Sequence, residues 1–183
     1  MLAKSKNINS YFKAPNFKLL NINKKVINLN EIKGSKGTLI CFICNHCPYV
    51  KAIIHKLVRD TNELRKHDIS SVAIMPNDVN SYPEDSFDKM VEFSKINKLE
   101  IPYLYDETQN VAKSYNAVCT PDFFGFNSNL ELKFRGRIDN SGINNIENTK
   151  RELFYSMLAI SNNKKIPFNN PSIGCSIKWK KND

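Results

Sequence analysis

The chain has 183 residues, which is enough for one domain with a buried core and gives no reason to expect a second. Its 27 Lys and Arg residues outnumber 18 Asp and Glu residues, for a formal net charge of +9. The basic residues occur in short, scattered pairs such as Lys24-Lys25 and Lys164-Lys165. We therefore expect a solvated basic surface and no nucleic-acid partner.

The cysteine content argues against a secreted disulfide scaffold. Such scaffolds are small and evenly paired, whereas this chain has five cysteines, three of them within residues 41–47. The first sixteen residues contain no continuous apolar stretch, so we expect neither a secretory signal nor a membrane partner. A cytoplasmic location is the expectation, and there a closely spaced cysteine pair is typically catalytic or metal-binding.

Hydrophobic patterns predict strands alternating with helices, then a hairpin and a last helix. The expected elements are a hairpin of 17–20 and 26–29, a buried strand at 38–43, a helix from Val50 with Pro48 in its first turn, a buried strand at 69–75, a helix from Pro83 that carries Leu99, an extended piece at 102–105, a helix at 108–115 with a capping box of Asp106 and Gln109, a hairpin of 122–126 and 130–137, and a helix at 147–160.

This order of elements predicts an α/β fold, with a central mixed sheet flanked by helices on both faces. Residues 1–16 form an N-terminal extension in this interpretation, and 17–161 form the domain. The tail, 162–183, contains the only tryptophan and Cys175. We expect this tail to pack back on the body of the same domain.

The segment Cys44-Asn45-His46-Cys47 lies between the first buried strand and the following helix. At a helix N-terminus, unpaired backbone N–H groups and the helix dipole favour an anion such as a thiolate. The pattern places Cys44 near that N-terminus and Cys47 one turn along on the same side. A disulfide could then open and close with little backbone movement, so the two cysteines are the candidate catalytic residues.

The wider run from Cys41 to Cys47 also has a spacing seen in zinc and iron–sulfur sites, with His46 as a fourth ligand. A buried strand and a helix start cannot easily wrap one ion, because cluster loops need irregular backbone. We therefore expect no metal and no other cofactor, and Cys41 as a small core residue. A non-enzymatic redox-sensing or metal-binding module is retained as an alternative.

The order of elements, the cysteine pair after the first core strand and the Thr120-Pro121 pair before the second hairpin resemble the thioredoxin-like superfamily. Within it, the chain is most similar to the peroxiredoxin-like proteins of the alkyl-hydroperoxide-reductase and thiol-specific-antioxidant group. The stretches that carry this resemblance are 44–52, 102–106, 119–124 and 171–180. It implies a thioredoxin-like fold, a redox enzyme acting through thiols, and a cis-proline at Pro121 that faces the dithiol and offers backbone hydrogen bonds to a substrate chain.

The resemblance to thioredoxins and the resemblance to peroxiredoxins imply different nucleophilic cysteines. Thioredoxins attack with the first cysteine, here Cys44, and resolve with the second, Cys47. In a peroxiredoxin the peroxidatic cysteine occupies the position of Cys47, and Cys44 would resolve it. That family also places Thr or Ser three residues earlier and Pro seven earlier, where this chain has Cys44 and Ile40. A thiol is a weaker hydrogen-bonding group than a hydroxyl.

This substitution favours thiol–disulfide exchange with a protein or a low-molecular-weight thiol over peroxide reduction. A peroxidase would also need an arginine beside its thiolate, and Arg135 and Arg137 are the possible sources. His46, when protonated, would favour a neighbouring thiolate; alternatively it is a solvent-facing residue without such a role. The strand at 38–43 lacks the buried acid that thioredoxins keep, so proton transfer is expected to use His46, water or another group.

Two further cysteines are candidates for resolving a sulfenic acid or a mixed disulfide. Cys119 lies two residues before Pro121, on the loop expected to face the dithiol. Cys175 lies in the tail and would reach the site if the tail folds across it. The alternative for each is an inert packed thiol.

Overall fold

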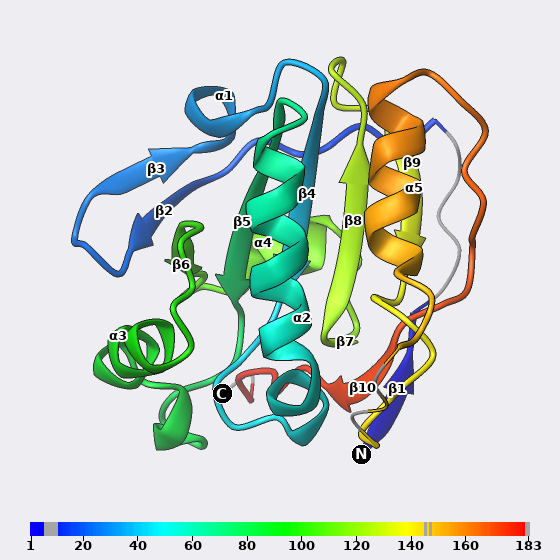
Figure 1. The fold of residues 1–183 in the computed structure, drawn as a ribbon. Coiled ribbons are helices and arrows are strands. Elements are labelled where there is room, and N and C mark those ends of the chain that lie inside the picture. Colours follow the sequence, from blue (N-terminus) through cyan, green and yellow to red (C-terminus); the bar gives the residue numbers. More distant parts are fainter. Residues whose placement is uncertain (6–10, 145, 147, 182–183) are drawn as a thin grey trace.

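The computed structural model describes residues 1–5, 11–144, 146 and 148–181, and a sheet of seven strands lies at its centre (Figure 1). The strands are β1 (Leu2–Lys4), β2 (Lys18–Asn21), β3 (Val26–Asn28), β4 (Gly37–Phe42), β5 (Ile69–Met75), β6 (Tyr103–Tyr105), β7 (Cys119–Thr120), β8 (Asp122–Phe126), β9 (Leu132–Gly136) and β10 (Ile173–Ser176). The helices are α1 (Leu29–Ile32), α2 (Pro48–Arg65), α3 (Phe87–Ile96), α4 (Asn110–Ser114) and α5 (Glu152–Ser161), with a 3₁₀ turn at Pro83–Asp85.

The central sheet has the order β3-β2-β6-β5-β4-β8-β9. Its three inner strands β4, β5 and β6 are parallel, and the outer pairings are antiparallel. The apolar runs of β4 and β5 have this central position because both faces of each strand are covered. The α/β fold with a mixed sheet and an early hairpin is therefore confirmed.

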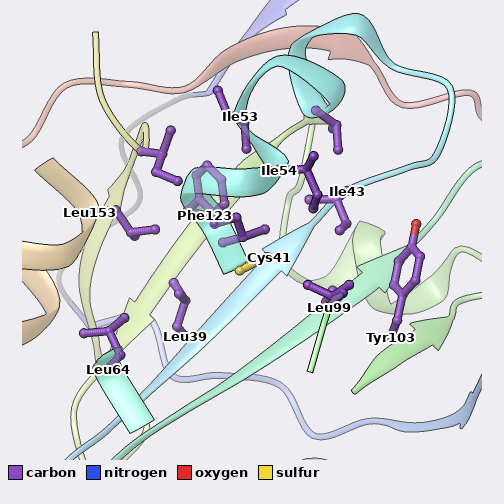
Figure 2. Close-up of a cluster of buried hydrophobic side chains, with 14 of the residues drawn as sticks. Leu39, Cys41, Ile43, Ile53, Ile54, Leu64, Leu99, Tyr103, Phe123 and Leu153 are labelled. Atoms are coloured by element: carbon purple, nitrogen blue, oxygen red, sulfur yellow. The ribbon is translucent and has the colours of Figure 1, made fainter. Parts of the chain in front are cut away.

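Helices cover both faces of the sheet, and alternate residues of β4 point to opposite sides. Leu39 and Cys41 face the layer of α2, α3 and α5, whereas Ile40 and Phe42 face α1 and α4. Figure 2 shows the Cys41 side chain among Leu39, Ile54 and Phe123. Burial raises the pKa of the Cys41 thiol, so it is a neutral core residue, as expected.

The two ends of the described chain meet in a second, smaller sheet with the order β1-β10-β7. Figure 1 shows this sheet beside the start of α2. The tail thus packs back on the body, as the fold prediction expects. Strand β1 was not predicted, because three residues are too few for a periodic pattern.

Several predicted helix boundaries were wrong. The helix expected from Pro83 is split into a 3₁₀ turn and α3, and Leu99 lies beyond the end of α3. Asp106 accepts hydrogen bonds from the backbone of Val111 and Ala112, so the expected capping box with Gln109 does not form.

The last helix begins at Glu152, five residues later than predicted. Its expected start, Glu147, lies outside the described residues. None of the described helices combines the length and the apolar character needed to cross a membrane.

Candidate redox site

The two cysteines of the Cys-x-x-Cys motif lie before α2 and at its N-cap. The N-cap is Cys47, with an extended backbone at φ −62° and ψ 122°, and Pro48 is the first helical residue. A residue before proline is disfavoured in the helical region, so the helix cannot begin earlier than Pro48. The expectation that Cys44 stands at the helix start and Cys47 one turn inside was therefore wrong, because the register is shifted by one turn.

Cys47 is the sulfur that this arrangement favours as a thiolate. A hydrogen bond from the Cys44 side chain, opposed by burial, and backbone N–H groups of Cys175 and Val50 lower its pKa to about 5. A side-chain hydrogen bond from Cys175 acts in the same direction. Its place at the N-cap of an 18-residue helix adds the electrostatic attraction of the helix N-terminus for an anion.

Cys44 is the protonated partner of that thiolate. Its hydrogen bond to Cys47, its burial and the negative charge of Asp85 raise the pKa of the Cys44 thiol well above its ordinary value. Both sulfurs are fully buried. The two pKa shifts therefore favour a Cys47 thiolate beside a neutral Cys44 thiol at neutral pH, with both side chains buried.

Thr120 contacts both cysteines from the opposite side. Its hydroxyl oxygen lies 3.3 Å from the Cys44 sulfur, and its carbonyl oxygen lies 3.1 Å from the Cys47 sulfur, where it accepts from the neutral thiol. The peptide bond between Thr120 and Pro121 is cis, as the resemblance implied. Thr120 thus lies beside both cysteines, and the supporting roles of Thr120 and Pro121 stay predictions.

His46 is half-buried and is held by a carboxylate. Its Nδ1 lies 2.6 Å from Oδ2 of Asp85, and its ring stacks on that of Tyr82 at a centroid distance of 5.4 Å. The hydrogen bond to Asp85, opposed by burial, raises the pKa of the imidazole. The charge of a Cys47 thiolate acts in the same direction. His46 therefore has fixed partners and is not simply a solvent-facing residue.

Asp85 is the functional residue that sequence reasoning missed. It is fully buried, and its Oδ1 accepts from the backbone N–H of Asn45 at 2.8 Å and of His46 at 3.2 Å. Asn77 donates to the other oxygen at 2.8 Å. Burial raises the pKa of this carboxyl, but the hydrogen bonds from His46 and Asn77 outweigh burial and lower it. Asp85 thus supplies, from the 3₁₀ turn, the buried acid that β4 lacks.

The structure places Cys175 at the site and Cys119 beside it. Cys175 is partly exposed, and its pKa is raised to about 11 by burial, by its hydrogen bond to Cys47 and by the charge of that thiolate. Cys119 is fully buried and donates to the carbonyl of Pro121 at 3.4 Å, and burial raises its pKa. The catalytic and resolving roles of these cysteines stay predictions.

The two candidate arginines are held by carboxylates. Arg135 contacts Asp122 at 2.7 Å and stacks on Phe124, on the sheet face opposite α2. Arg137 contacts Glu152 at 2.8 Å. Arg137 also lines a cavity beside Pro121.

A cavity of about 390 Å³ opens beside Pro121, on the side where α2 begins. It is lined mainly by apolar residues of β1, α2 and β8, together with the loop after β9. Its size is that of a small-molecule pocket. The lining includes Pro121, which follows the residue that contacts both cysteines.

One group of residues has the donor atoms that a metal would need. Cys44, His46 and Asp85 each place one ligand atom within 4.8 Å of the other two. Sulfur, imidazole and carboxylate are zinc ligands, but a structural zinc site needs four of them. The imidazole nitrogen of His46 and the carboxylate of Asp85 are also bonded to each other in this structure.

The sheet order, the Cys-x-x-Cys segment at the start of α2 and the cis Thr120–Pro121 bond define a thiol-based redox protein of thioredoxin-like fold. The chain belongs to the AhpC/TSA family, whose model matches residues 12–138. A comparison with proteins of curated function gave no match.

Solved structures agree with this assignment. An uncharacterized conserved protein from Geobacillus kaustophilus is 41% identical with a TM-score of 0.95, covering 100% of this chain and 98% of that one. A hypothetical protein from Sinorhizobium meliloti 1021 is 31% identical with a TM-score of 0.93, covering 98% and 99%. Peroxidoxin BcpB from Mycobacterium tuberculosis, at 13% identity, a TM-score of 0.58 and coverage of 69% and 84%, shows the shared fold alone.

Proposed function

We propose that the protein is a thiol–disulfide oxidoreductase in which Cys47 is the attacking thiolate and Cys44 the resolving thiol. The observation that carries the proposal is the position of Cys47 at the N-cap of α2 beside Cys44, whose interaction with it lowers the pKa of Cys47 to about 5 and raises the pKa of Cys44. This arrangement provides a nucleophile that is ionised at neutral pH, next to a second thiol that can displace whatever becomes attached to it.

The reaction has two exchange steps. The Cys47 thiolate attacks one sulfur of a disulfide RSSR, which forms a Cys47–SR bond and releases RS⁻. Cys44 then loses its proton and attacks the Cys47 sulfur, which forms the Cys44–Cys47 disulfide and releases a second RS⁻. The substrate disulfide is reduced by two electrons and the cysteine pair is oxidised by two; the reverse sequence oxidises a dithiol.

The proton of Cys44 has an acceptor nearby. A nitrogen of His46 and a carboxylate oxygen of Asp85 lie within 4.8 Å of the Cys44 sulfur. The pair is held together by its 2.6 Å hydrogen bond. We infer that it takes the proton when Cys44 attacks and returns it when Cys44 leaves, which is an acid–base role that histidine fills in proteins.

Thiol peroxidase activity is the second candidate. Membership of the AhpC/TSA family favours it, as does a thiolate at Cys47 rather than Cys44. Against it, Cys44 takes the place of the hydroxyl residue expected there. Arg135 and Arg137, the candidate arginines, are each paired with a carboxylate, Asp122 and Glu152.

Stopped-flow oxidation by hydrogen peroxide and by a small disulfide, compared in wild type, Cys44→Ser and Cys47→Ser, tests both candidates. We expect rapid oxidation by the disulfide that requires Cys47, and a Cys44–Cys47 disulfide in the wild-type product by peptide mass spectrometry. Cys41→Ser is the matched control, because that thiol is buried in the core. Its oxidation rate should equal that of the wild type.

The oxidation rates of the variants distinguish the disulfide oxidoreductase from the peroxidase. A peroxide reaction that survives in Cys44→Ser, disappears in Cys47→Ser and is faster than the disulfide reaction would establish the peroxidase and overturn our proposal. Fast disulfide oxidation that survives in Cys47→Ser and disappears in Cys44→Ser would assign the attack to Cys44. Oxidation no faster than that of a free thiol by either reagent would reject both enzymatic functions.

A further inference from the structure

The backbone edge beside Pro121 is already occupied by the chain's own tail. In the small sheet, Cys175 of β10 pairs with Thr120 of β7, and Ser176 pairs with Cys119. The other edge of β10 pairs with β1. An extended substrate chain that added a strand to β7 would need backbone donors and acceptors that β10 already uses. The segment of the molecule that lies where such a chain would bind therefore carries a cysteine of its own.

Close packing brings β10 to this position. A Cβ atom at Gly174 would overlap the backbone carbonyl of Thr120, so this residue must be glycine for the strand to lie where it does. Cys175 is the next residue, and its backbone N–H and its thiol both interact with Cys47 in the direction that lowers the pKa of the Cys47 thiol. Cys175 is also partly exposed, whereas Cys44 and Cys47 are fully buried.

We propose that Cys175 is the thiol through which the buried pair exchanges with external low-molecular-weight thiols, by way of an intramolecular Cys47–Cys175 disulfide. This inference rests on the proposed function, because it assigns the route by which the Cys44–Cys47 disulfide is reduced. It also assigns the substrate class: a small thiol can reach a partly exposed sulfur without displacing β10, and an extended protein chain cannot.

The sequence of exchanges balances without any further oxidant or reductant. The Cys175 thiolate attacks the Cys47 sulfur, forms the Cys47–Cys175 bond and releases Cys44 as a thiolate that takes up the proton. An external thiolate RS⁻ then attacks the Cys175 sulfur, forms Cys175–SR and releases the Cys47 thiolate. A second RS⁻ attacks the outer sulfur of the Cys175–SR disulfide, forms RSSR and releases the Cys175 thiolate. Overall, two RSH become RSSR and the Cys44–Cys47 disulfide is reduced to two thiols.

The electrostatics of Cys175 change in the direction that this route needs. In the reduced protein, the hydrogen bond to Cys47 and the charge of the thiolate both hold the pKa of Cys175 high. In the Cys44–Cys47 disulfide, neither is present, while the favourable charge of Lys178 remains. Cys175 is then ionised more readily when the disulfide it would attack has formed.

The test follows the reduction of the Cys44–Cys47 disulfide by glutathione in wild type, Cys175→Ser and Cys41→Ser, with maleimide quenching and mass spectrometry. Cys41 is the matched control, because it is a fully buried core cysteine with no role at the site. We expect Cys175→Ser to be slowed at least ~10-fold and Cys41→Ser to be unchanged within about 2-fold. Circular dichroism and Cys175→Ala check that the folded state is retained.

A second measurement traps the intermediate. Cys44→Ser is treated with one equivalent of oxidised glutathione and digested at low pH, and we expect the peptide that contains Cys47 to be bonded to the one that contains Cys175. A stable Cys47–glutathione adduct with no Cys47–Cys175 bond would overturn the proposal, as would reduction of Cys175→Ser at the wild-type rate. If the wild type forms no Cys44–Cys47 disulfide at all, the proposed function fails instead, and the Cys44→Ser product still decides the fate of Cys175.

Discussion

The ionisation of Cys47 is the property from which the proposed chemistry follows, and it has a measurable size. With a pKa of about 5, about 99% of Cys47 is thiolate at pH 7, against about 1% for a thiol at its ordinary value of 9.0. The gain of about 100-fold in thiolate is largely offset, because a drop of about four pKa units lowers intrinsic nucleophilicity about 60-fold. The pH at which the thiolate forms, not the absolute rate, is therefore the decisive quantity.

Ultraviolet absorbance of the thiolate measures this pH without requiring a reagent to reach the buried sulfur. In the reduced wild type we expect a step equal to one thiolate with a midpoint near pH 5, because burial and neighbouring charges raise the pKa of the other three buried thiols. Cys47→Ser should abolish the step. A hydrogen bond to a charged group contributes about 1.5–3 kcal/mol, so Cys44→Ala should move the midpoint up by about 1–2 units.

Cys44→Ser is the matched control for that shift, because a hydroxyl can still donate to the thiolate. Its midpoint should lie closer to the wild-type value than that of Cys44→Ala. If the wild type shows no step below pH 7, the assignment of a thiolate to Cys47 is wrong. If the step survives in Cys47→Ser and is lost in Cys44→Ser, the thiolate belongs to Cys44, as in a thioredoxin.

Three other predictions test the surroundings of the pair. Asp85→Asn removes the carboxylate that raises the pKa of His46, so the His46 NMR titration midpoint should fall; an unchanged midpoint would contradict the role given to Asp85. Gly174→Ala should destabilise the protein by about 1–3 kcal/mol in urea and slow reduction by glutathione, whereas wild-type behaviour would mean that β10 is not tightly held. Protein purified without chelator should contain less than stoichiometric metal and exchange at the same rate after EDTA; an equivalent of zinc would support a metal site at Cys44 instead.

The parts of the fold that the sequence predicted are those determined by local pattern. The apolar run Ile69–Met75 is β5 with the predicted boundaries, because a strand buried on both faces must be apolar at every position. The helix after the Cys-x-x-Cys segment begins at Pro48. The proline itself predicts this start, because the residue before a proline is disfavoured in the helical region. The same signal places Cys47 outside the helix, at its N-cap.

The missing parts of the site come from residues that are distant in sequence. Asp85 stands forty residues beyond Asn45, and its predicted role was only that of an ordinary helix start. Nothing in the pattern Pro83-Glu84-Asp85-Ser86 distinguishes a buried hydrogen-bond acceptor from a solvated acid. Likewise, the contact of Cys175 with Cys47 depends on a strand pairing across the molecule, which periodicity does not predict.

The burial of Cys47 and its low pKa place opposite demands on the site. A thiolate can react only if a substrate reaches it, but the Cys47 sulfur is fully buried beneath β10 and Thr120. The hydrogen bonds that stabilise the thiolate come from Cys44, Cys175 and the start of α2, so the same groups that activate the sulfur also cover it. Transfer of the disulfide to a partly exposed neighbour satisfies both demands, because the thiolate keeps its donors while exchange with external thiols takes place at Cys175.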